Sequence, residues 1–98
     1  MQKQFFIYLL TNYKNTVIYT GVTSDLIKRV WEHKNKVDTN SFTAKYNVNK
    51  LVYYKECQNS ISAITREKQI KAGSRNKKEE LILGFNPDKI DLYSSILS

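Results

Sequence analysis

Two short segments near the N-terminus have the hydrophobic pattern of paired β-strands. Residues 5–11 (FFIYLLT) are almost entirely apolar or aromatic, and residues 16–23 (TVIYTGVT) are rich in β-branched and aromatic side chains, as is typical of strands. The polar residues 12–15 between them (NYKN) form a turn sequence. Two such strands joined by a short turn predict a β-hairpin.

The position of the turn predicts which residues of the hairpin face each other. With the turn centred between Tyr13 and Lys14, Tyr8 faces Tyr19, within a register error of one or two residues. Directly opposed side chains lie on one face of a sheet, with Cβ atoms roughly 5 Å apart. Two adjacent phenols are open to two interpretations: ordinary cross-strand aromatic packing, or two components of one functional site.

Further along the chain, helical and extended patterns alternate. Leu26, Val30 and Val37 recur at helical spacing, whereas residues 50–55 (KLVYYK) are typical of a strand. The predicted elements are a helix over 25–36 capped by Thr23 or Ser24, a polar loop over 37–49, the strand 50–55, and helices over 60–73 and 76–83 that end at Gly73 and Gly84. The apolar residues of the tail are expected to pack on the body of the domain.

Composition bounds the class of protein. A chain of 98 residues fits one domain, residues 1–98, and 41% hydrophobic with 26% charged residues is a globular composition. The single cysteine, Cys57, excludes an intramolecular disulfide and a cysteine-based zinc cluster. No apolar run approaches the roughly 18 residues of a membrane helix, and no signal peptide is recognisable. The reducing cytoplasm is therefore the expected compartment.

The net charge narrows the kind of partner. Sixteen Lys and Arg against nine Asp and Glu give a formal charge of +7. This favours an anionic partner, either nucleic acid or an anionic membrane surface. The basic residues are spread along the chain, so a folded basic surface is expected rather than a disordered basic arm.

Glu67 is unusual because it interrupts an apolar stripe. Ala63, Ile64 and Ile70 lie one helical turn away on either side, and a carboxylate among them is costly to desolvate unless it is paired or bound to a metal. Lys71, four residues on, offers an ion pair. The sequence leaves both interpretations open.

A second unusual pair stands on the preceding helix. Arg29 and His33 are four residues apart and share one helix face. They are suited to binding a phosphate, the guanidinium as a fork and the imidazole as a donor or proton carrier, although a solvated helix face is the alternative. Lys77 and Lys78 are equally open to either interpretation: a solvated charge run or phosphate contacts.

Taken in order, these features resemble the GIY-YIG nuclease superfamily. The hairpin carries Phe6-Ile7-Tyr8 and Tyr19-Thr20-Gly21, with Phe6 and Thr20 where the name motif has Gly and Ile; neither change removes a reacting group. The further segments that match in order are Arg29 with His33, FTAKYN (42–47), LVYY (51–54), AITREKQIK (63–71) and Asn86-Pro87. Within the superfamily, the chain is most similar to small stand-alone bacterial members related to the N-terminal domain of the excision-repair incision subunit.

The resemblance implies an α+β fold, with a three-stranded antiparallel β-sheet flanked by helices, and phosphodiester cleavage with one divalent metal, Mg²⁺ or Mn²⁺. By this resemblance, Tyr8 and Tyr19 are the motif tyrosines, and Tyr19 activates or orients the attacking water. Arg29 stabilises the charge of the scissile phosphate, and His33 assists proton transfer or contacts the phosphate. Glu67 is the metal ligand, and Asn86 supports the site. As nucleic-acid contacts we predict Lys45, Lys71, Arg75, Lys77 and Lys78.

Three functional hypotheses follow. The first is a metal-dependent endonuclease acting on DNA, with RNA not excluded, directed by DNA structure in repair or recombination. The second is a nucleic-acid-binding module of the same fold that cleaves weakly or not at all. The third is a basic adaptor for an acidic protein or an anionic membrane, which is disfavoured because no basic amphipathic helix with a large apolar face stands out.

Overall fold

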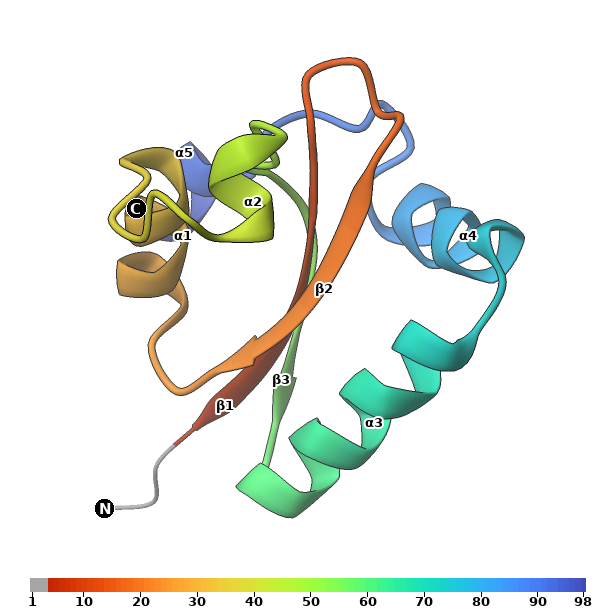
Figure 1. Cartoon of the computed structure of the whole chain (residues 1–98). Coiled ribbons are helices and arrows are strands. Elements are labelled where there is room, and N and C mark those ends of the chain that lie inside the picture. Colours follow the sequence, from red (N-terminus) through yellow and green to blue (C-terminus); the bar gives the residue numbers. More distant parts are fainter. Residues whose placement is uncertain (1–3) are drawn as a thin grey trace.

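A sheet of three antiparallel strands forms the centre of the domain, with β1 (Phe5–Thr11) between β2 (Ile18–Thr23) and β3 (Lys50–Cys57). The structure is a computed structural model and describes residues 4–98 (Figure 1). The helices are α1 (Leu26–Lys34), α2 (Phe42–Lys45), α3 (Ser60–Ala72), α4 (Arg75–Phe85) and α5 (Tyr93–Leu97). The predicted α+β architecture, a three-stranded antiparallel sheet flanked by helices, is confirmed.

The two faces of the sheet carry two separate clusters of buried side chains. On one face, α3 and α4 pack against β1 and β3, through residues that include Ile7, Leu9, Val52, Ala63, Ile70 and Ile82. On the other face, α1 and α5 cover a cluster of Tyr8, Leu10, Leu26, Val30, Val48 and Leu51. Figure 1 shows α3 and α4 on one side of the strands and α1, α2 and α5 on the other. Alternate residues of β1 therefore belong to different cores.

The hairpin register differs from the predicted one by two residues. Tyr8 pairs with Gly21, and Tyr19 pairs with Leu10, so the two tyrosines are not directly opposed, although the shift lies within the expected register error of one or two residues. The connection is longer than expected because Asn12 accepts hydrogen bonds from the backbone N–H groups of Thr16 (2.8 Å) and Val17 (3.1 Å). Since the shift is even, both tyrosines stay on the same face, with ring centroids 6.3 Å apart.

Gly21 occupies the position opposite Tyr8 because the phenol ring lies directly against it. A Cβ atom added at Gly21 would lie 2.4 Å from Cζ and 2.5 Å from the hydroxyl oxygen of Tyr8. Atoms do not approach so closely, so any other residue would displace the Tyr8 ring. The Gly of this segment is therefore explained by packing rather than by backbone conformation.

The first helix is two residues shorter at its C-terminus than predicted, and its cap is different. Asp25 is the N-cap and accepts a hydrogen bond from the Lys28 N–H (3.1 Å). The predicted caps, Thr23 and Ser24, precede it; the Thr23 hydroxyl instead accepts a bond from the Asp25 N–H (3.0 Å). The chain leaves the helix after Lys34, and Lys36 adopts a positive φ of 49°.

Other boundaries also differ from the sequence prediction: β2 begins at Ile18 rather than at residue 16, β3 continues to Cys57 rather than to residue 55, and α4 begins at Arg75 rather than at residue 76. The predicted loop over 37–49 contains α2, whose N-cap Ser41 accepts a hydrogen bond from the Ala44 N–H (3.2 Å). Gly84 does not end α4, which continues to Phe85 and is capped by Asn86. The predicted helix over 60–73 is confirmed as α3, with Gly73 as its C-cap.

The tail packs on the body as predicted and ties three elements together. Asp91 accepts hydrogen bonds from the backbone N–H groups of Leu51 (3.2 Å) and Tyr93 (3.0 Å). The same carboxylate forms an ion pair with Lys34 near the end of α1. The ammonium group of Lys34 also donates to the carbonyl of Asn49 (2.9 Å). The C-terminal end of α1 is thus fixed to the start of β3 through the tail.

The close approach at Gly21 predicts a large difference between two glycine substitutions. Gly21→Ala should lower the free energy of unfolding by about 1–3 kcal/mol, because the new methyl group overpacks the buried Tyr8 ring. Gly84→Ala is the matched control: its Cβ would meet nothing within 4 Å, and alanine is favoured in a helix by roughly 0.5–1 kcal/mol. Urea denaturation of both variants measures the effect, and equal stabilities would contradict the packing argument.

Candidate active site

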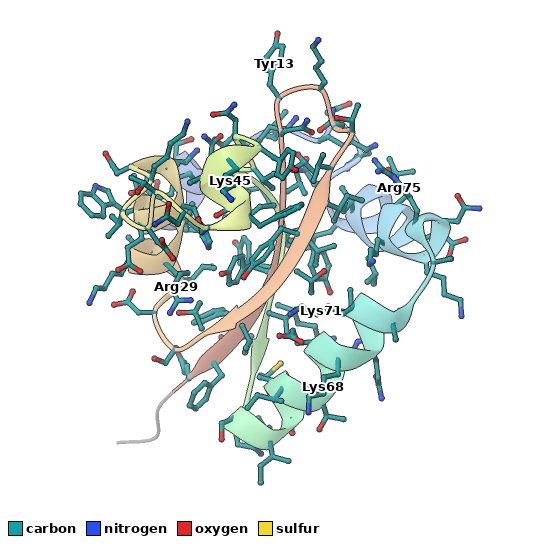
Figure 2. All side chains as sticks on the ribbon, in the orientation of Figure 1. Tyr13, Arg29, Lys45, Lys68, Lys71 and Arg75 are labelled. Atoms are coloured by element: carbon teal, nitrogen blue, oxygen red, sulfur yellow. The ribbon has the colours of Figure 1, made fainter. Side chains whose placement is uncertain are left out.

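A cavity of about 260 Å³ opens beside the hairpin, between β2, α1 and the segment that leads into α2. Its walls carry a phenol, a guanidinium, an imidazole and several hydroxyl and carboxylate groups. The lining residues are Tyr19, Arg29, Glu32, His33, Lys36, Val37, Asp38, Ser41 and Thr43. Figure 2 shows Arg29 on the α1 side of β2, with Lys45 on the nearby α2.

Arg29 and His33 are brought to this cavity by one face of α1. Leu26 and Val30 are buried against the sheet, and the adjoining strip of the same helix carries Arg29 and His33, one helical turn apart, to the cavity. The guanidinium of Arg29 is half exposed, and its Nε lies 3.3 Å from a carboxylate oxygen of Glu32. An exposed cation at the mouth of a cavity is suited to an incoming phosphate.

The two motif tyrosines have different access to the cavity. Tyr19 lines it, and its ring centroid lies 5.6 Å from that of His33. Tyr8 has no exposed surface; its hydroxyl lies 2.9 Å from Nε2 of His33. Tyr8 therefore contacts the imidazole from the buried side, whereas Tyr19 and His33 line the cavity. Phe6, which stands where the name motif has Gly, packs against the Tyr8 cluster and does not line the cavity.

The protonation states of this group follow from burial. Burial raises the pKa of Tyr8 well above its usual range; the charge of the neighbouring Arg29 opposes this increase only in part. Burial lowers the pKa of His33 below 6.5; Arg29 lowers it further and Glu32 opposes the shift. At neutral pH the site therefore contains a protonated phenol and a neutral imidazole, which is able to accept a proton.

Glu67 lies on α3, which packs on the opposite face of the sheet from α1, and it does not line this cavity. Its side chain is only 13% exposed, and a carboxylate oxygen lies 3.3 Å from Nζ of Lys71. The ion pair, one of the two interpretations from the sequence, is therefore present. Metal binding by this largely buried carboxylate stays a prediction. Figure 2 shows Lys71 on the α3 side of β2.

The donor set at Glu67 fits a magnesium-type ion with few protein ligands. No cluster of three or more His, Cys, Asp or Glu that could hold a metal occurs among residues 4–98, so a site rich in protein ligands is not available there. Mg²⁺ commonly keeps several waters and uses one or two carboxylates together with substrate phosphates. A single half-buried carboxylate is compatible with that mode of binding.

Asn86 is placed away from the cavity and is engaged with the backbone. Its amide nitrogen donates to the carbonyls of Val52 (3.2 Å) and Ile90 (2.8 Å), and its amide oxygen accepts from the Ile90 N–H (3.2 Å). The residue is buried and caps α4. These contacts give Asn86 a role in joining α4, β3 and the tail.

The predicted nucleic-acid contacts do not form one cluster. Lys45 is exposed on α2, near the cavity. Lys77 and Lys78 line a second cavity of about 340 Å³ between α3 and α4. Arg75 donates to the carbonyls of Asn15 (2.7 Å) and Thr16 (2.6 Å) in the hairpin loop and pairs with Glu79 (3.3 Å). Arg75 thus clamps the loop to α4, a contact that sequence reasoning missed.

Sequence reasoning also missed two hydroxyl groups at the cavity. Nδ1 of His33 lies 2.9 Å from Oγ1 of Thr43, which in turn lies 3.2 Å from Oγ of Ser41. The segment was predicted as a loop because four residues are too few to show helical periodicity. A serine is a common N-cap residue, so Ser41 is the signal that could have indicated a helix start there.

Comparison with known proteins agrees with the fold and with the hairpin motifs. Residues 4–80 match the GIY-YIG catalytic domain. The chain belongs to the GIY-YIG family. This family is a nuclease superfamily, its members generally use divalent metal ions, and the domain implies a nucleic-acid substrate.

Two relatives are small proteins of similar length. The chain is 36% identical to UPF0213 protein CPE1444 of Clostridium perfringens over 77 residues, which are 79% of this chain and 81% of that protein. It is similar to the solution structure of UPF0213 protein BH0048 of Bacillus halodurans, with a TM-score of 0.55 and 26% identity over 88% of this chain and 90% of that one. The predicted resemblance to small stand-alone members is therefore confirmed.

The structure also bears on the predicted absence of a membrane segment. Within residues 4–98, none of the helices combines the length and apolar character needed to cross a membrane.

The buried position of His33 predicts the direction of its titration. Because folding lowers the pKa of His33, the unfolded chain binds the proton more tightly than the folded one. The contribution to stability is complete above the unfolded pKa of about 6.5 and is lost as the pH falls toward the folded pKa. Since the chain has 1 His, the imidazole Hε1 resonance in NMR reports this group alone.

The midpoint of the His33 titration should lie below pH 6.5. The midpoint temperature of thermal unfolding should decrease as the pH is lowered through the same interval. His33→Gln is the control, because glutamine does not titrate and this component of the pH dependence should disappear. A midpoint at or above 6.5 would contradict the buried, neutral imidazole.

Proposed function

We propose that the protein is a metal-dependent endonuclease that hydrolyses phosphodiester bonds in DNA. The observation that carries this proposal is the cavity beside β2, where a half-exposed guanidinium, an accessible phenol and a neutral imidazole line one space. Phosphodiester hydrolysis requires charge stabilisation on the phosphate, a positioned water and an acceptor for its proton. Membership of a nuclease superfamily supports the same reaction class.

Each group in the cavity has a chemical role in this proposal. Arg29 binds the non-bridging oxygens of the scissile phosphate, because its guanidinium is free enough to exchange Glu32 for the substrate. The Tyr19 hydroxyl orients the attacking water. His33, held neutral, receives the proton that the water loses. Tyr8 is a positioning residue, since its buried hydroxyl contacts the imidazole and not the cavity.

The reaction balances without a further co-reactant. The water oxygen forms a bond to phosphorus while the bond from phosphorus to the bridging oxygen breaks. Nε2 of His33 receives the proton of the water as the Tyr8 hydroxyl turns its own proton away and accepts the new N–H in return. The proton is later returned to solvent or to the leaving oxygen. The products are a phosphate monoester and a hydroxyl group.

Glu67 is the residue that would hold the divalent metal, Mg²⁺ or Mn²⁺. When bound, the ion would supply positive charge to the phosphate oxygens. The largely buried carboxylate, with Lys71 as its charged neighbour, supports this assignment because a divalent ion could replace the ammonium group as its partner, with the second positive charge of the ion left for the substrate phosphate. Substrate would then contact both sides of β2, which is an edge strand of the sheet.

Affinity for nucleic acid is assigned to the net charge of +7 rather than to one patch. Binding of this kind is mostly electrostatic, falls with salt and reads little sequence. Lys45 beside the cavity and Lys71, Lys77 and Lys78 on α3 and α4 are the proposed contacts, with Arg75 mainly a clamp for the hairpin loop. Such a domain suits recognition of DNA structure, as in repair or recombination, and the expected compartment remains the cytoplasm.

A cleavage panel tests the proposal. Duplex, single-stranded, flapped and branched DNA, with matched RNA, are incubated with the protein and Mg²⁺ or Mn²⁺. Arg29→Ala should lower the cleavage rate by about 10²-fold or more, because one preorganised donor to the phosphate is lost. Arg66→Ala, which removes an arginine of the α3–α4 cavity instead, is the control and should retain the rate within a few fold.

The metal assignment has its own variant. Glu67→Gln keeps the size of the side chain and should reduce cleavage to the rate measured with chelator, while Glu80→Gln on the exposed side of α4 should leave it unchanged. Adding Mg²⁺ after chelation should restore cleavage by the wild-type protein but not by the Glu67→Gln variant. Salt-dependent binding of DNA without metal-dependent cutting of any substrate would overturn the nuclease and favour the binding module.

A further inference from the structure

We propose that Thr43 is a positioning residue that fixes the tautomer of His33, through a chain of hydrogen bonds that ends at the backbone carbonyl of Asp38. The consequence for cleavage rests on the proposed function, whereas the tautomer itself does not. The chain runs from Tyr8 to His33 (2.9 Å), from His33 to Thr43 (2.9 Å), from Thr43 to Ser41 (3.2 Å) and from Ser41 to the Asp38 carbonyl (2.8 Å).

The direction of every bond in this chain follows from its last member. A backbone carbonyl can only accept, so the contact of Ser41 Oγ with the Asp38 carbonyl uses the one hydroxyl proton of Ser41. The same oxygen also accepts from the Ala44 N–H (3.2 Å). Ser41 therefore has a lone pair, and no proton, to offer Thr43.

Thr43 must then donate its hydroxyl proton to Ser41, which leaves its oxygen as an acceptor for His33. This requires the proton of the neutral imidazole to stand on Nδ1. Nε2 is consequently unprotonated and accepts the hydroxyl proton of Tyr8. In the opposite tautomer Thr43 would donate to Nδ1, and the single proton of Ser41 could then serve only one of its two contacts. Either the oxygens of Thr43 and Ser41 (3.2 Å) or those of Ser41 and the Asp38 carbonyl (2.8 Å) would face each other as two acceptors.

Because this chain of hydrogen bonds is largely buried, reversing its donors would cost free energy. Tyr8 has no exposed surface and Thr43 is 3% exposed, so water cannot readily substitute for a lost partner. A buried donor or acceptor left without a partner costs its full desolvation. Because Ser41 is at once the N-cap of α2 and a member of the chain, the fold of α2 and the tautomer of His33 depend on the same hydroxyl group.

For the proposed reaction, this tautomer places the basic lone pair at Nε2, the nitrogen that contacts the Tyr8 hydroxyl, and it keeps the proton of the imidazole at Nδ1, beside Thr43. With the other tautomer, Nε2 carries a proton and cannot accept one. In this proposal Thr43 acts on catalysis only through His33, because its single hydroxyl proton is used by Ser41.

Imidazole ¹⁵N NMR tests the tautomer directly, at a pH where His33 is neutral. The single histidine of the chain gives one pair of nitrogen signals without any need for assignment by mutation. In the wild-type protein, Nδ1 should show the shift of a protonated nitrogen and Nε2 that of an unprotonated one. In Thr43→Val, which keeps the branched shape but removes the acceptor, the population of the Nε2–H tautomer should rise and become the majority. Thr43→Ser should restore the wild-type pattern.

A wild-type protein with its proton on Nε2 would overturn the proposal without recourse to any variant. An unchanged tautomer in a folded Thr43→Val protein, with its amide spectrum preserved, would also overturn it. If Thr43→Val fails to fold, the wild-type and Thr43→Ser spectra still decide the polarity of the chain.

Kinetics then separate this inference from the proposed function. If the wild-type protein cleaves DNA, Thr43→Val should lower kcat by about tenfold or more with KM nearly unchanged, and Thr43→Ser should recover it. A tautomer that switches as expected in a protein that cleaves nothing would support the role of Thr43 and reject the nuclease. A switched tautomer with unchanged kcat would retain the structural assignment of Thr43 but overturn its role in positioning the base.

Discussion

The contact of the Tyr8 ring with the backbone of Gly21 is the constraint on which the arrangement of the site depends. The ring lies where a side chain of residue 21 would otherwise project, and this allows its hydroxyl to reach the imidazole of α1. The hairpin and the first helix are thus joined by one phenol that has no exposed surface. The cavity is built on this contact, because His33 and Tyr19 form the wall in front of it.

The two buried faces of the sheet explain why much of the fold could be predicted from the sequence. Strands alternate their side chains, so apolar runs such as residues 5–11 indicated a strand buried on both faces, and three strands with intervening helices were correctly placed. The hairpin motifs and the helical spacing of Arg29 and His33 also predicted which side chains meet. That they line one cavity with Tyr19 agrees with this reasoning.

What the sequence could not predict depended on local hydrogen bonds between polar side chains. The two-residue shift of the hairpin comes from Asn12, which closes a wider loop with its own side chain. The helix α2 and the Thr43–Ser41 contact lie in a polar segment without periodicity. The separate positions of Glu67 and Asn86 relative to the cavity are set by the packing of α3 and α4, which no spacing in one sequence encodes.

Asp91 is synthesised long after the helix α1 that it helps to fix. The segment that matches the family ends at residue 80, yet the end of the helix that carries His33 is held by an ion pair of Lys34 with Asp91, and the start of β3 is bonded to the same carboxylate. A nascent chain that has already produced Arg29 and His33 therefore still lacks the ion pair that fixes the C-terminal end of their helix. The anchor at the end of α1 can form only after a residue 57 positions downstream of Lys34 has been added to the chain.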